Sequence, residues 1–415
     1  MIALSVLDVL FYSILASLIV PYTLGLLVLL WNGKEYKTEP KGNFAPTITL
    51  VIPTYNEGAV IERKLDNVLE LDYPRDKLRI IVVDSGSTDD TRSIVRKFAS
   101  EHDGRLSISI LEQPSRMGKS EAINEALRHS DSEILALTDA DVTFPAGSLY
   151  ELVAGFQDPK VGAVSGVEVP VGGDAMAHRL EADYRRIYTA IRMAEASTDS
   201  PFMCESELSA YRRNILQPLP SGTMCDDIEL TVGVRSKGYR SDYDLQAPFF
   251  EAEAGTLKSK FKHKLRRGMA NQHALLRNSH LLFNKAYGRY GTVVYPFEFF
   301  TQIVSPVLLL AAVCVVIPLT ITDPAAGLIA ILVGGFSSLP SLAIVDRLMH
   351  KYSTMDAATP RGTGFWPLAA AAYISFQVAL VASLLRLAFK GPVVNWTQIS
   401  ETRTAVAVTT RNEIV

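Results

Sequence analysis

The chain has 415 residues, enough for a domain of about 250 residues and several further elements. Its formal net charge of −3 at pH 7 argues against a nucleic-acid partner. Hydrophobic residues make up 48% of the sequence, and the excess gathers toward both ends. The three cysteines, Cys204, Cys225 and Cys314, have neither the spacing of metal ligands nor an even number, so we expect reduced thiols.

The first apolar stretch, Leu10 to Trp31, carries no charge and is long enough to cross a bilayer. It lacks the basic start and the shorter apolar region of a secretory signal, so we expect a retained transmembrane helix within residues 1–36. Three lysines follow it, Lys34, Lys37 and Lys41. By the positive-inside rule they place the next domain in the cytoplasm, after a proline-containing linker at 37–46.

Strand-like and helix-like stretches alternate from Thr47 to about Leu276. This alternation predicts an α/β domain with a mostly parallel sheet covered by helices on both faces. The expected strands are Ile48–Pro53, Leu78–Asp84, Leu106–Glu112, Ile134–Asp139 and Val161–Val169. The expected helices between them are Ala59–Leu69, Thr88–Ala99 and Ser120–His129. The glycine-rich fingerprint of dinucleotide binding does not follow the first strand.

Two carboxylates, Asp139 and Asp141, end the apolar run that begins at Ile134, and Pro145 is expected to start the next helix. In an open α/β sheet, ligands bind beyond the carboxyl ends of the strands. Carboxylates at that edge suit a hard divalent cation and, through it, a diphosphate. Taken alone, such a pair more often marks a solvated acidic turn.

Three further motifs are expected at the same edge of the sheet. The stretch Pro53–Gly58 offers backbone amides, an aromatic ring and a carboxylate, and Asp84 ends the second apolar strand. Lys119 stands at a helix start, where the dipole disfavours a cation unless an anion is bound nearby. Each motif has an ordinary alternative as a turn, a helix cap or a surface charge. Together they place acidic and anion-binding groups along one edge.

Five stretches, in this order and spacing, resemble the catalytic domain of a family 2 glycosyltransferase with the nucleotide-sugar fold called GT-A. They are Pro53–Glu57, Val83–Thr88, Gly118–Asn124, Asp139–Asp141 and Cys225–Leu230. The resemblance implies a cytoplasmic GT-A domain over residues 37–277, with an amphipathic interfacial helix at 255–277. With apolar segments at both ends, the chain is most similar to the membrane-embedded branch. That branch includes cellulose, chitin and hyaluronan synthases and dolichyl-phosphate sugar transferases.

The resemblance also implies roles for single residues. The donor-binding residues would be Pro53, Thr54, Tyr55, Glu57, Asp84, Lys119, Asp139 and Arg266. Asp141 would bind Mn²⁺ or Mg²⁺, which would neutralise the diphosphate leaving group as a Lewis acid. Asp227 would be the general base of an inverting single displacement. The alternative for Asp226 and Asp227 is a helix N-terminus that carries favourable acids, which is compatible with catalysis.

Two departures from the family bear on the acceptor. Processive synthases carry Q-x-x-R-W where this chain has His263, Arg266 and Arg267, so the aromatic platform for the acceptor sugar is missing. This favours transfer of one or a few sugars, although the region also fits a basic helix on anionic lipid. Relatives often carry glycine where Cys204–Glu207 stand, and a surface strand is the alternative there. The residues expected at the acceptor are Glu205, Glu207, Asp226, His263 and Arg267.

Three more apolar stretches, Ile303–Ile321, Ala325–Val345 and Trp366–Leu387, can each cross a bilayer. They would lie within residues 278–390, after an interfacial segment and before a tail at 391–415. Basic residues flank both sides of the last stretch, at Arg347, Lys351 and Arg361 and at Arg386 and Lys390. The positive-inside rule therefore leaves the side of the tail open, and a re-entrant segment is an alternative.

These patterns predict a multi-pass enzyme of the cell membrane with a cytoplasmic catalytic domain. It would move a sugar from a UDP- or GDP-sugar to a lipid acceptor, either a polyprenyl phosphate or a lipid-linked glycan. Membrane anchoring favours a lipid acceptor because it raises the acceptor's effective concentration. Two alternatives stay open: a processive synthase that translocates its polymer, and a catalytically inactive scaffold that binds nucleotide sugars.

Overall fold

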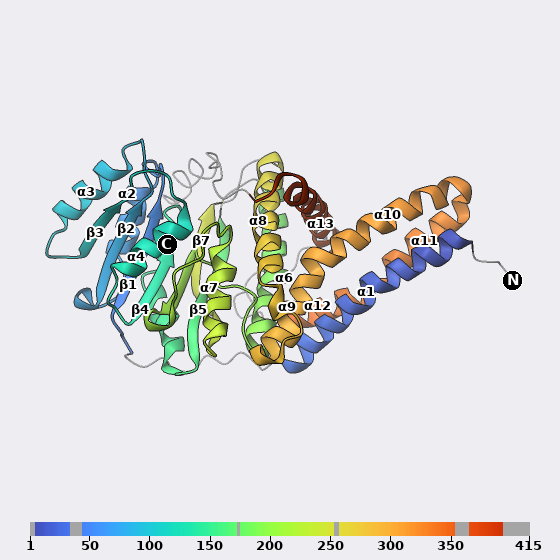
Figure 1. Ribbon diagram of the computed structural model, residues 1–415, viewed down its shortest axis with the longest axis horizontal. Helices are drawn as coiled ribbons and strands as arrows, with labels where there is room; N and C mark the ends of the chain where they lie inside the picture. The colour runs from blue at the N-terminus through green and yellow to red at the C-terminus, as the bar shows by residue number, and fades with distance from the viewer. Residues whose placement is uncertain (1–4, 34–43, 172–174, 253–256, 353–364, 393–415) are drawn as a thin grey trace. The chain divides into compact units, whose positions relative to one another are not determined.

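The computed structural model describes residues 5–33, 44–171, 175–252, 257–352 and 365–392 (Figure 1). The chain forms two compact units. The sheet unit is built from Lys37–Arg185 and Ser200–Lys262. The helical unit is built from Met1–Tyr36, Arg186–Asp199 and His263–Gly391. Residues 37–43 of the predicted linker, 255–256 of the predicted interfacial helix, Arg361 and the tail from residue 393 lie outside the described residues.

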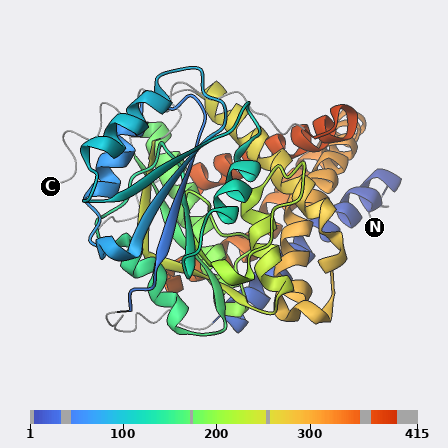
Figure 2. The same cartoon turned by 60° about the vertical axis from the view of Figure 1, so that its left-hand side comes forward.

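The sheet unit contains a seven-stranded sheet in the order β3-β2-β1-β4-β6-β5-β7 (Figures 1 and 2). The strands are β1 Ile48–Thr54, β2 Leu78–Asp84, β3 Ser107–Glu112, β4 Ile134–Thr138, β5 Val161–Val171, β6 Leu208–Arg212 and β7 Arg240–Ala252. Strands β1 to β4 run parallel, and β7 runs parallel to β5. Only β6 runs antiparallel to its neighbours, β4 and β5. The expected α/β class with a mostly parallel sheet is confirmed.

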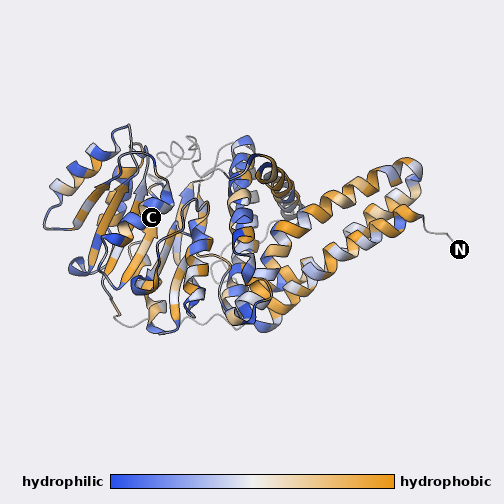
Figure 3. Ribbon diagram, in the orientation of Figure 1, coloured by the Kyte–Doolittle hydropathy of each residue, from blue (hydrophilic) through white to orange (hydrophobic). Residues whose placement is uncertain are grey.

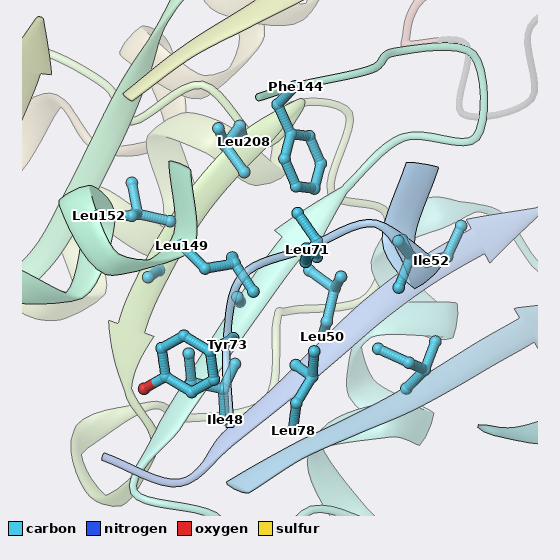
Figure 4. Close-up of a cluster of buried hydrophobic side chains, with 14 of the residues drawn as sticks. Ile48, Leu50, Ile52, Leu71, Tyr73, Leu78, Phe144, Leu149, Leu152 and Leu208 are labelled. Carbon is cyan, nitrogen blue, oxygen red and sulfur yellow. The ribbon is translucent and has the colours of Figure 1, made fainter. Parts of the chain in front are cut away.

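Alternating side chains of the strands enter two cores, one on each face of the sheet. On one face, Leu50 belongs to a buried cluster with α2 (Ile61–Leu69), α3 (Thr91–Glu101) and α5 (Ser148–Ala154), part of which is shown in Figure 4. On the other face, the next residue, Val51, packs with α4 (Lys119–Arg128) and α7 (Asp226–Ser236). Because successive side chains of a strand point to opposite faces, each apolar run contributes to the cores on both faces of the sheet.

One alternative and several expected helix starts differ from the structure. The segment around residue 208 is not a surface strand, because β6 lies between β4 and β5 with Leu208, Ala210 and Tyr211 buried. Pro145 does not begin a helix, because α5 starts three residues later at Ser148. The helix starts after the first two strands are also later than expected, since α2 begins at Ile61 and α3 at Thr91.

The helical unit holds apolar helices of 5 to 27 residues. They are α1 Val6–Asn32, α9 Tyr295–Phe299, α10 Ser305–Thr322, α11 Pro324–Ser337, α12 Leu339–Tyr352 and α13 Phe365–Lys390. Two helices are divided between the units: α6 (Ala175–Thr198) after Arg185 and α8 (Leu257–Arg277) after Lys262. Among the described residues, four segments are long and apolar enough to cross a membrane (Figure 3). They are Val6–Asn32, Tyr290–Thr322, Pro324–Tyr352 and Tyr373–Lys390, and each overlaps one of the four expected spans.

A buried polar network lies among the helices of the helical unit. Arg192 on α6 pairs with Glu195 at 3.0 Å and also contacts Glu298 on α9. The side chain of Gln302 donates a hydrogen bond to Glu298 at 2.6 Å. Two π-helical turns, Tyr290–Val294 and Phe300–Val304, flank α9. Buried charges of this kind persist because they are paired, and losing one partner is costly.

Candidate active site

The loops after β1 and β2 are joined by hydrogen bonds. Asn56, in the left-handed region with φ of 54°, donates from its N–H to the Ser87 hydroxyl at 2.8 Å. Its side-chain oxygen accepts from the N–H of Thr88 at 2.8 Å, and the N–H of Glu57 donates to the Thr91 hydroxyl at 2.8 Å. These contacts fix the turn after β1, where the sequence predicts nucleoside binding.

Asp84 ends β2 and is fully buried. Its Oδ2 accepts from the N–H of Ser87 at 3.0 Å and from Nε of Arg92 at 2.5 Å. Its Oδ1 is buried with no hydrogen-bond partner among the described residues. A buried acceptor without a partner is costly, so Oδ1 is suited to accept from an N–H of a bound ligand. Tyr55 lies in the turn after β1. The guanidinium of Arg116, which follows β3, lies 4.2 Å from the centroid of its ring.

Helix α2 holds the loop that carries Asp139 and Asp141. The buried Lys64 donates from Nζ to the Thr138 hydroxyl at 2.6 Å and to the Val142 carbonyl at 3.0 Å. Arg63 donates to the carbonyl oxygen of Asp141 at 3.3 Å. Burial lowers the pKa of Lys64 to about 7, while the nearby Asp139 and Asp141 oppose that shift. The loop is thus fixed through its backbone, which leaves the two carboxylates at the sheet edge.

Lys119, the first residue of α4, joins this loop to helix α7. Its Nζ lies 2.7 Å from Oδ1 of Asp139 and 3.6 Å from Oδ2 of Asp226. It also donates to the hydroxyl of Ser206 at 2.6 Å, and the N–H of Ser206 donates to Oδ1 of Asp227 at 2.9 Å. Residues from four separate stretches of the chain therefore meet, and two of them, Lys119 and Asp139, are among those expected at the common sheet edge.

The carboxylates of this group perturb one another. Burial raises the pKa of Asp139 to about 6, with Lys119 opposing and Glu207 reinforcing the shift. Burial, followed by the charges of Asp226 and Glu207, raises the pKa of Asp227 well above its usual range. Since the charge of Glu207 acts on both Asp139 and Asp227, this glutamate belongs to the same group.

Glu205 has different surroundings from Glu207. It is buried and lies 3.6 Å from the guanidinium of Arg185, which also contacts Glu168 and, at 3.5 Å, Glu181. Its own N–H donates to the hydroxyl of Ser165 at 2.9 Å. Glu205 is therefore engaged in a buried ion cluster of the sheet unit. Its contact with an acceptor stays a prediction.

The remaining predicted residues are placed as follows. Pro53 and Thr54 end β1, with Thr54 buried, and Glu57 is buried in the turn that follows. His263, Arg266 and Arg267 lie on α8 in the helical unit, where a guanidinium nitrogen of Arg266 is 2.9 Å from Nε2 of His263. Their roles at the diphosphate and the acceptor stay predictions.

The carboxylates at the sheet edge fit a metal that is shared with a substrate. The described residues contain no group of three or more His, Cys, Asp or Glu side chains that could hold a metal ion. Mg²⁺ is commonly bound by one or two carboxylates together with substrate phosphates rather than by a full protein cage. Asp141, with Asp139 two residues before it, supplies hard oxygen donors of that kind.

Lys64 and Ser206 are contributions to the site that the motifs do not reveal. Lys64 follows the apolar spacing of α2, between the buried Ile61 and Val68, and a charge on an apolar face is the signal that could have found it. Ser206 lies in the stretch Cys204–Glu207, already noted for its departure from the family. Its two contacts depend on tertiary structure, so no local pattern identifies them.

Comparisons with known proteins show which family and fold the chain resembles. Residues 49–219 match the family described as Glycosyl transferase family 2. A probable glycosyltransferase, YdaM of Bacillus subtilis, is 31% identical over 242 residues, which cover 56% of this chain and 57% of that protein. A beta-monoglucosyldiacylglycerol synthase of Nostoc sp. is 34% identical over 131 residues, which cover 32% of this chain and 28% of that protein. A poly-beta-1,6-N-acetyl-D-glucosamine synthase of Staphylococcus aureus is 23% identical over 236 residues, 56% of each chain. The chain thus spans about half, or less, of the length of these curated relatives.

One similar solved structure extends over almost the whole chain. It is a mannosyltransferase from Pyrobaculum calidifontis in complex with GDP-Man and Mn²⁺. The TM-score is 0.72 and the sequence identity 26%, with 92% of this chain and 99% of that chain covered. The expected GT-A fold is thereby confirmed. Residues 49–219 thus match glycosyltransferase family 2, and the fold around them is similar to that of the solved mannosyltransferase.

Proposed function

We propose that this chain is an inverting, metal-dependent membrane glycosyltransferase. It would move a sugar from a UDP- or GDP-sugar to a lipid acceptor, a polyprenyl phosphate or a lipid-linked glycan. The observation that carries this proposal is the double contact of Lys119, 2.7 Å from Asp139 and 3.6 Å from Asp226. One lysine thus joins the carboxylate loop expected to hold the donor to the acid pair expected to act on the acceptor.

The donor side is supported by the buried Asp84, whose Oδ1 has no partner among the described residues. In this proposal Thr54, Tyr55 and Glu57 hold the nucleoside, and the buried Oδ1 of Asp84 accepts from an N–H of the base. Uracil and guanine both carry a ring N–H, so this contact serves either nucleotide. The solved mannosyltransferase holds GDP-Man, which makes GDP-linked sugars the first donors to test.

Asp141 would hold the metal, and the Mn²⁺ in the solved mannosyltransferase supports this assignment. When bound, the ion would neutralise the diphosphate leaving group as a Lewis acid. Lys119 adds a fixed positive charge at Asp139, beside the expected diphosphate. Arg63 and Lys64 hold the backbone of the metal loop in place through the carbonyls of Asp141 and Val142. These residues would orient the donor and stabilise the charge that develops on its departing oxygen.

Asp227 would act as the general base. Its Oδ1 accepts the N–H of Ser206 at 2.9 Å, which leaves Oδ2 for an acceptor hydroxyl. The hydroxyl oxygen attacks the anomeric carbon while its proton passes to Oδ2. The bond from that carbon to the diphosphate oxygen breaks, and the nucleoside diphosphate leaves with the bonding electrons. A single displacement from the opposite face inverts the anomeric configuration.

The membrane assignment is supported by the four apolar segments of the helical unit. The name of the Nostoc relative, a glucosyldiacylglycerol synthase, supports a lipid acceptor. In this proposal the protein is a multi-pass protein of the cell membrane, with the sheet unit in the cytoplasm. An anchored enzyme meets a lipid acceptor at a high effective concentration.

The test is a transfer assay on the full chain in detergent, with Mn²⁺, radiolabelled GDP- and UDP-sugars and extracted membrane lipid. We expect label in the lipid fraction with wild-type protein. The Asp227→Asn variant should give none, although it should still be stabilised thermally by the donor. Label found only in water-soluble oligosaccharide would exclude a lipid acceptor.

A processive polysaccharide synthase is the second candidate, because the Staphylococcus relative carries the name of one. It predicts a product of high molecular weight that grows with time. Arg267 stands where the processive synthases carry tryptophan, which argues against this candidate. Gel filtration of the labelled product separates the two functions, since a single transfer gives a product of fixed size.

A further inference from the structure

The hydroxyl of Thr231, on α7, joins that helix to the segment that precedes β6. It accepts from the N–H of Cys204 at 2.9 Å and donates to the carbonyl oxygen of Asp227, one helical turn earlier, at 2.8 Å. A hydrogen bond from a helical threonine to the carbonyl four residues before it is ordinary and needs no functional reason. The contact with Cys204 is different, because it fixes a separate stretch of backbone against the first turn of α7.

The carboxylate of Asp227 is held by the same stretch of backbone. Its Oδ1 accepts from the N–H of Ser206 at 2.9 Å, two residues after the N–H that Thr231 accepts. The contacts close a ring in which Thr231 holds main-chain groups of Asp227 and Cys204, and Ser206 holds the Asp227 side chain. Cys204, Ser206 and Thr231 are buried, so their hydrogen bonds form in surroundings where such bonds are strong.

Strand β5 fixes the residue between Cys204 and Ser206. The N–H of Glu205 donates to the hydroxyl of Ser165 at 2.9 Å, and Ser165 is itself buried on β5. Successive N–H groups of an extended segment point to opposite sides, which explains why the first and third reach α7 while the second reaches β5. Three consecutive N–H groups, each held by a side chain, thus define the position of Ser206.

The position of Ser206 matters because this residue contacts both halves of the proposed site. Its N–H donates to Asp227, and its hydroxyl accepts from Nζ of Lys119 at 2.6 Å. Lys119 in turn lies 2.7 Å from Oδ1 of Asp139, in the loop expected to hold the donor. A misplacement of about 1 Å can cost an enzyme about 100-fold in rate, so the groups that place Ser206 bear on the reaction.

We propose that Thr231 is a positioning residue of the transfer reaction, whose hydroxyl sets the segment Cys204–Ser206 so that Ser206 orients Asp227. The inference rests on the proposed function, because it takes Asp227 as the general base. Thr231 itself would touch neither donor nor acceptor, and it acts through Ser206. Ser165 supports the same segment from β5.

The hydrogen bond from Ser206 also bears on the charge of Asp227. Burial, followed by the charges of Asp226 and Glu207, raises the pKa of Asp227, while Lys119 and the Ser206 hydrogen bond lower it. Three buried groups that stay uncharged near neutral pH are also within range of its charge, namely the side chains of Cys204, Cys225 and Tyr211. Loss of the Ser206 contact removes a bond to the ionised form, so it should raise the pKa of Asp227 further.

Three variants of the full chain in detergent test the proposal. Thr231→Val keeps the shape of the side chain but removes the hydroxyl, whereas Thr231→Ser keeps the hydroxyl. Thr198→Val is the matched control, because the Thr198 hydroxyl donates to the Ala194 carbonyl at 2.7 Å in the ordinary helical manner. Transfer is measured with Mn²⁺, GDP-mannose or UDP-glucose, and extracted membrane lipid.

We expect Thr231→Val to lower kcat by about tenfold to 100-fold while the dissociation constant of the donor stays within about threefold. The acidic limb of its kcat/KM profile should move to higher pH, a change that a loss of stability alone does not cause. Thr231→Ser and Thr198→Val should keep kcat within about threefold of the wild-type value and leave the limb in place. Equal effects of Thr231→Val and Thr231→Ser on kcat and on the limb would overturn the inference.

Amide hydrogen exchange, followed by mass spectrometry, gives a measurement that needs no turnover. In a peptide that contains Cys204–Ser206, Thr231→Val should speed the exchange of these N–H groups, and Thr231→Ser should not. If Thr231→Val does not fold, Ser165→Ala should speed exchange in the same peptide and lower kcat. Transfer by the wild-type protein with unchanged exchange in the variants would overturn this inference alone. Protected N–H groups in a wild-type protein that transfers no sugar would overturn the proposed function.

Discussion

The buried ammonium group of Lys64 lies 2.6 Å from the hydroxyl of Thr138, the last residue before the carboxylate loop. The same group donates to the carbonyl of Val142 at 3.0 Å, so one lysine contacts both ends of the segment that contains Asp139 and Asp141. A second support comes from Asn67, one helical turn later, which exchanges hydrogen bonds with the backbone of Phe144 at 2.9 and 3.1 Å. The loop proposed to hold the metal is therefore pre-organised from α2.

Replacing Lys64 by Met should impair donor binding more than it impairs folding. The change leaves the Thr138 hydroxyl and the Val142 carbonyl without this partner, at a cost of roughly 1–3 kcal/mol for each buried group. A loop displaced by about 1 Å can lower the transfer rate by about 100-fold. The measurement is kcat/KM for the nucleotide sugar together with a thermal melt. Val68→Ala, which removes two buried methyl groups of the same helix but none of the Lys64 hydrogen bonds, is the control. Equal rate losses in both variants would show that Lys64 serves stability alone.

Replacing Asp227 by Asn should abolish transfer while sparing the donor. General-base catalysis contributes about 10²–10⁴-fold, and an amide cannot accept the proton of the acceptor. We expect a loss of that size in kcat and little change in the dissociation constant of the nucleotide sugar, measured by calorimetry. A variant that turned over at the wild-type rate would remove Asp227 from the mechanism.

The activity should depend on pH through Asp227. Burial, Asp226 and Glu207 raise its pKa above the ordinary value of about 4, so the ionised base appears only at higher pH. The acidic limb of kcat/KM should therefore lie above that of an ordinary carboxylate. Replacing Glu207 by Gln removes a like charge, favours the ionised form and should move the limb to lower pH. A shift to higher pH in this variant would contradict the assignment, and Glu229→Gln should leave the limb in place.

Transfer should require a divalent cation that Asp141 helps to hold. Removal of metal with EDTA should abolish transfer, and added Mn²⁺ or Mg²⁺ should restore it. Asp141→Asn loses an anionic ligand and should need at least tenfold more Mn²⁺ for half-maximal rate. The binding of Mn²⁺ in the presence of nucleotide, followed by its paramagnetic resonance signal, gives a second measure that does not depend on turnover. Undiminished Mn²⁺ binding by the variant would show that another residue is the ligand.

Removing Glu298 should destabilise the helical unit. Glu298 contacts the buried Arg192 and accepts from Gln302, and breaking a buried ion pair typically costs about 3–5 kcal/mol. The measurement is the thermal unfolding of Glu298→Ala in detergent. Asp346→Ala, at the more exposed Asp346–His350 pair with a separation of 3.7 Å, should cost only about 0–1 kcal/mol. Equal losses of stability would indicate that the buried ion pair contributes no more to stability than the exposed pair does.

Much of the sheet unit is predictable because its signals are local. Continuous apolar runs locate β1, β2 and β4, since each of these strands is buried on both faces. The motifs that follow these strands indicate one edge, because parallel strands bring their carboxyl ends together. The position of strand β6 in the sheet cannot be predicted in this way. Its short buried run resembles the other strands, and only pairing shows that it lies inside the sheet, antiparallel to both neighbours.

By itself, the amino-acid sequence determined the strand-end motifs, the family resemblance that they carry and the apolar segments, because these depend on residues close together in the chain. Tertiary structure alone decided which glutamate acts on the predicted site carboxylates Asp139 and Asp227. Glu205 and Glu207 are two residues apart and look equivalent in the sequence, yet Glu205 pairs with Arg185 while Glu207 acts on Asp139 and Asp227. The same holds for Lys64 and Ser206, because their partners are 21 to 87 positions away in the chain. Contacts at such separations follow from packing, which no local pattern encodes.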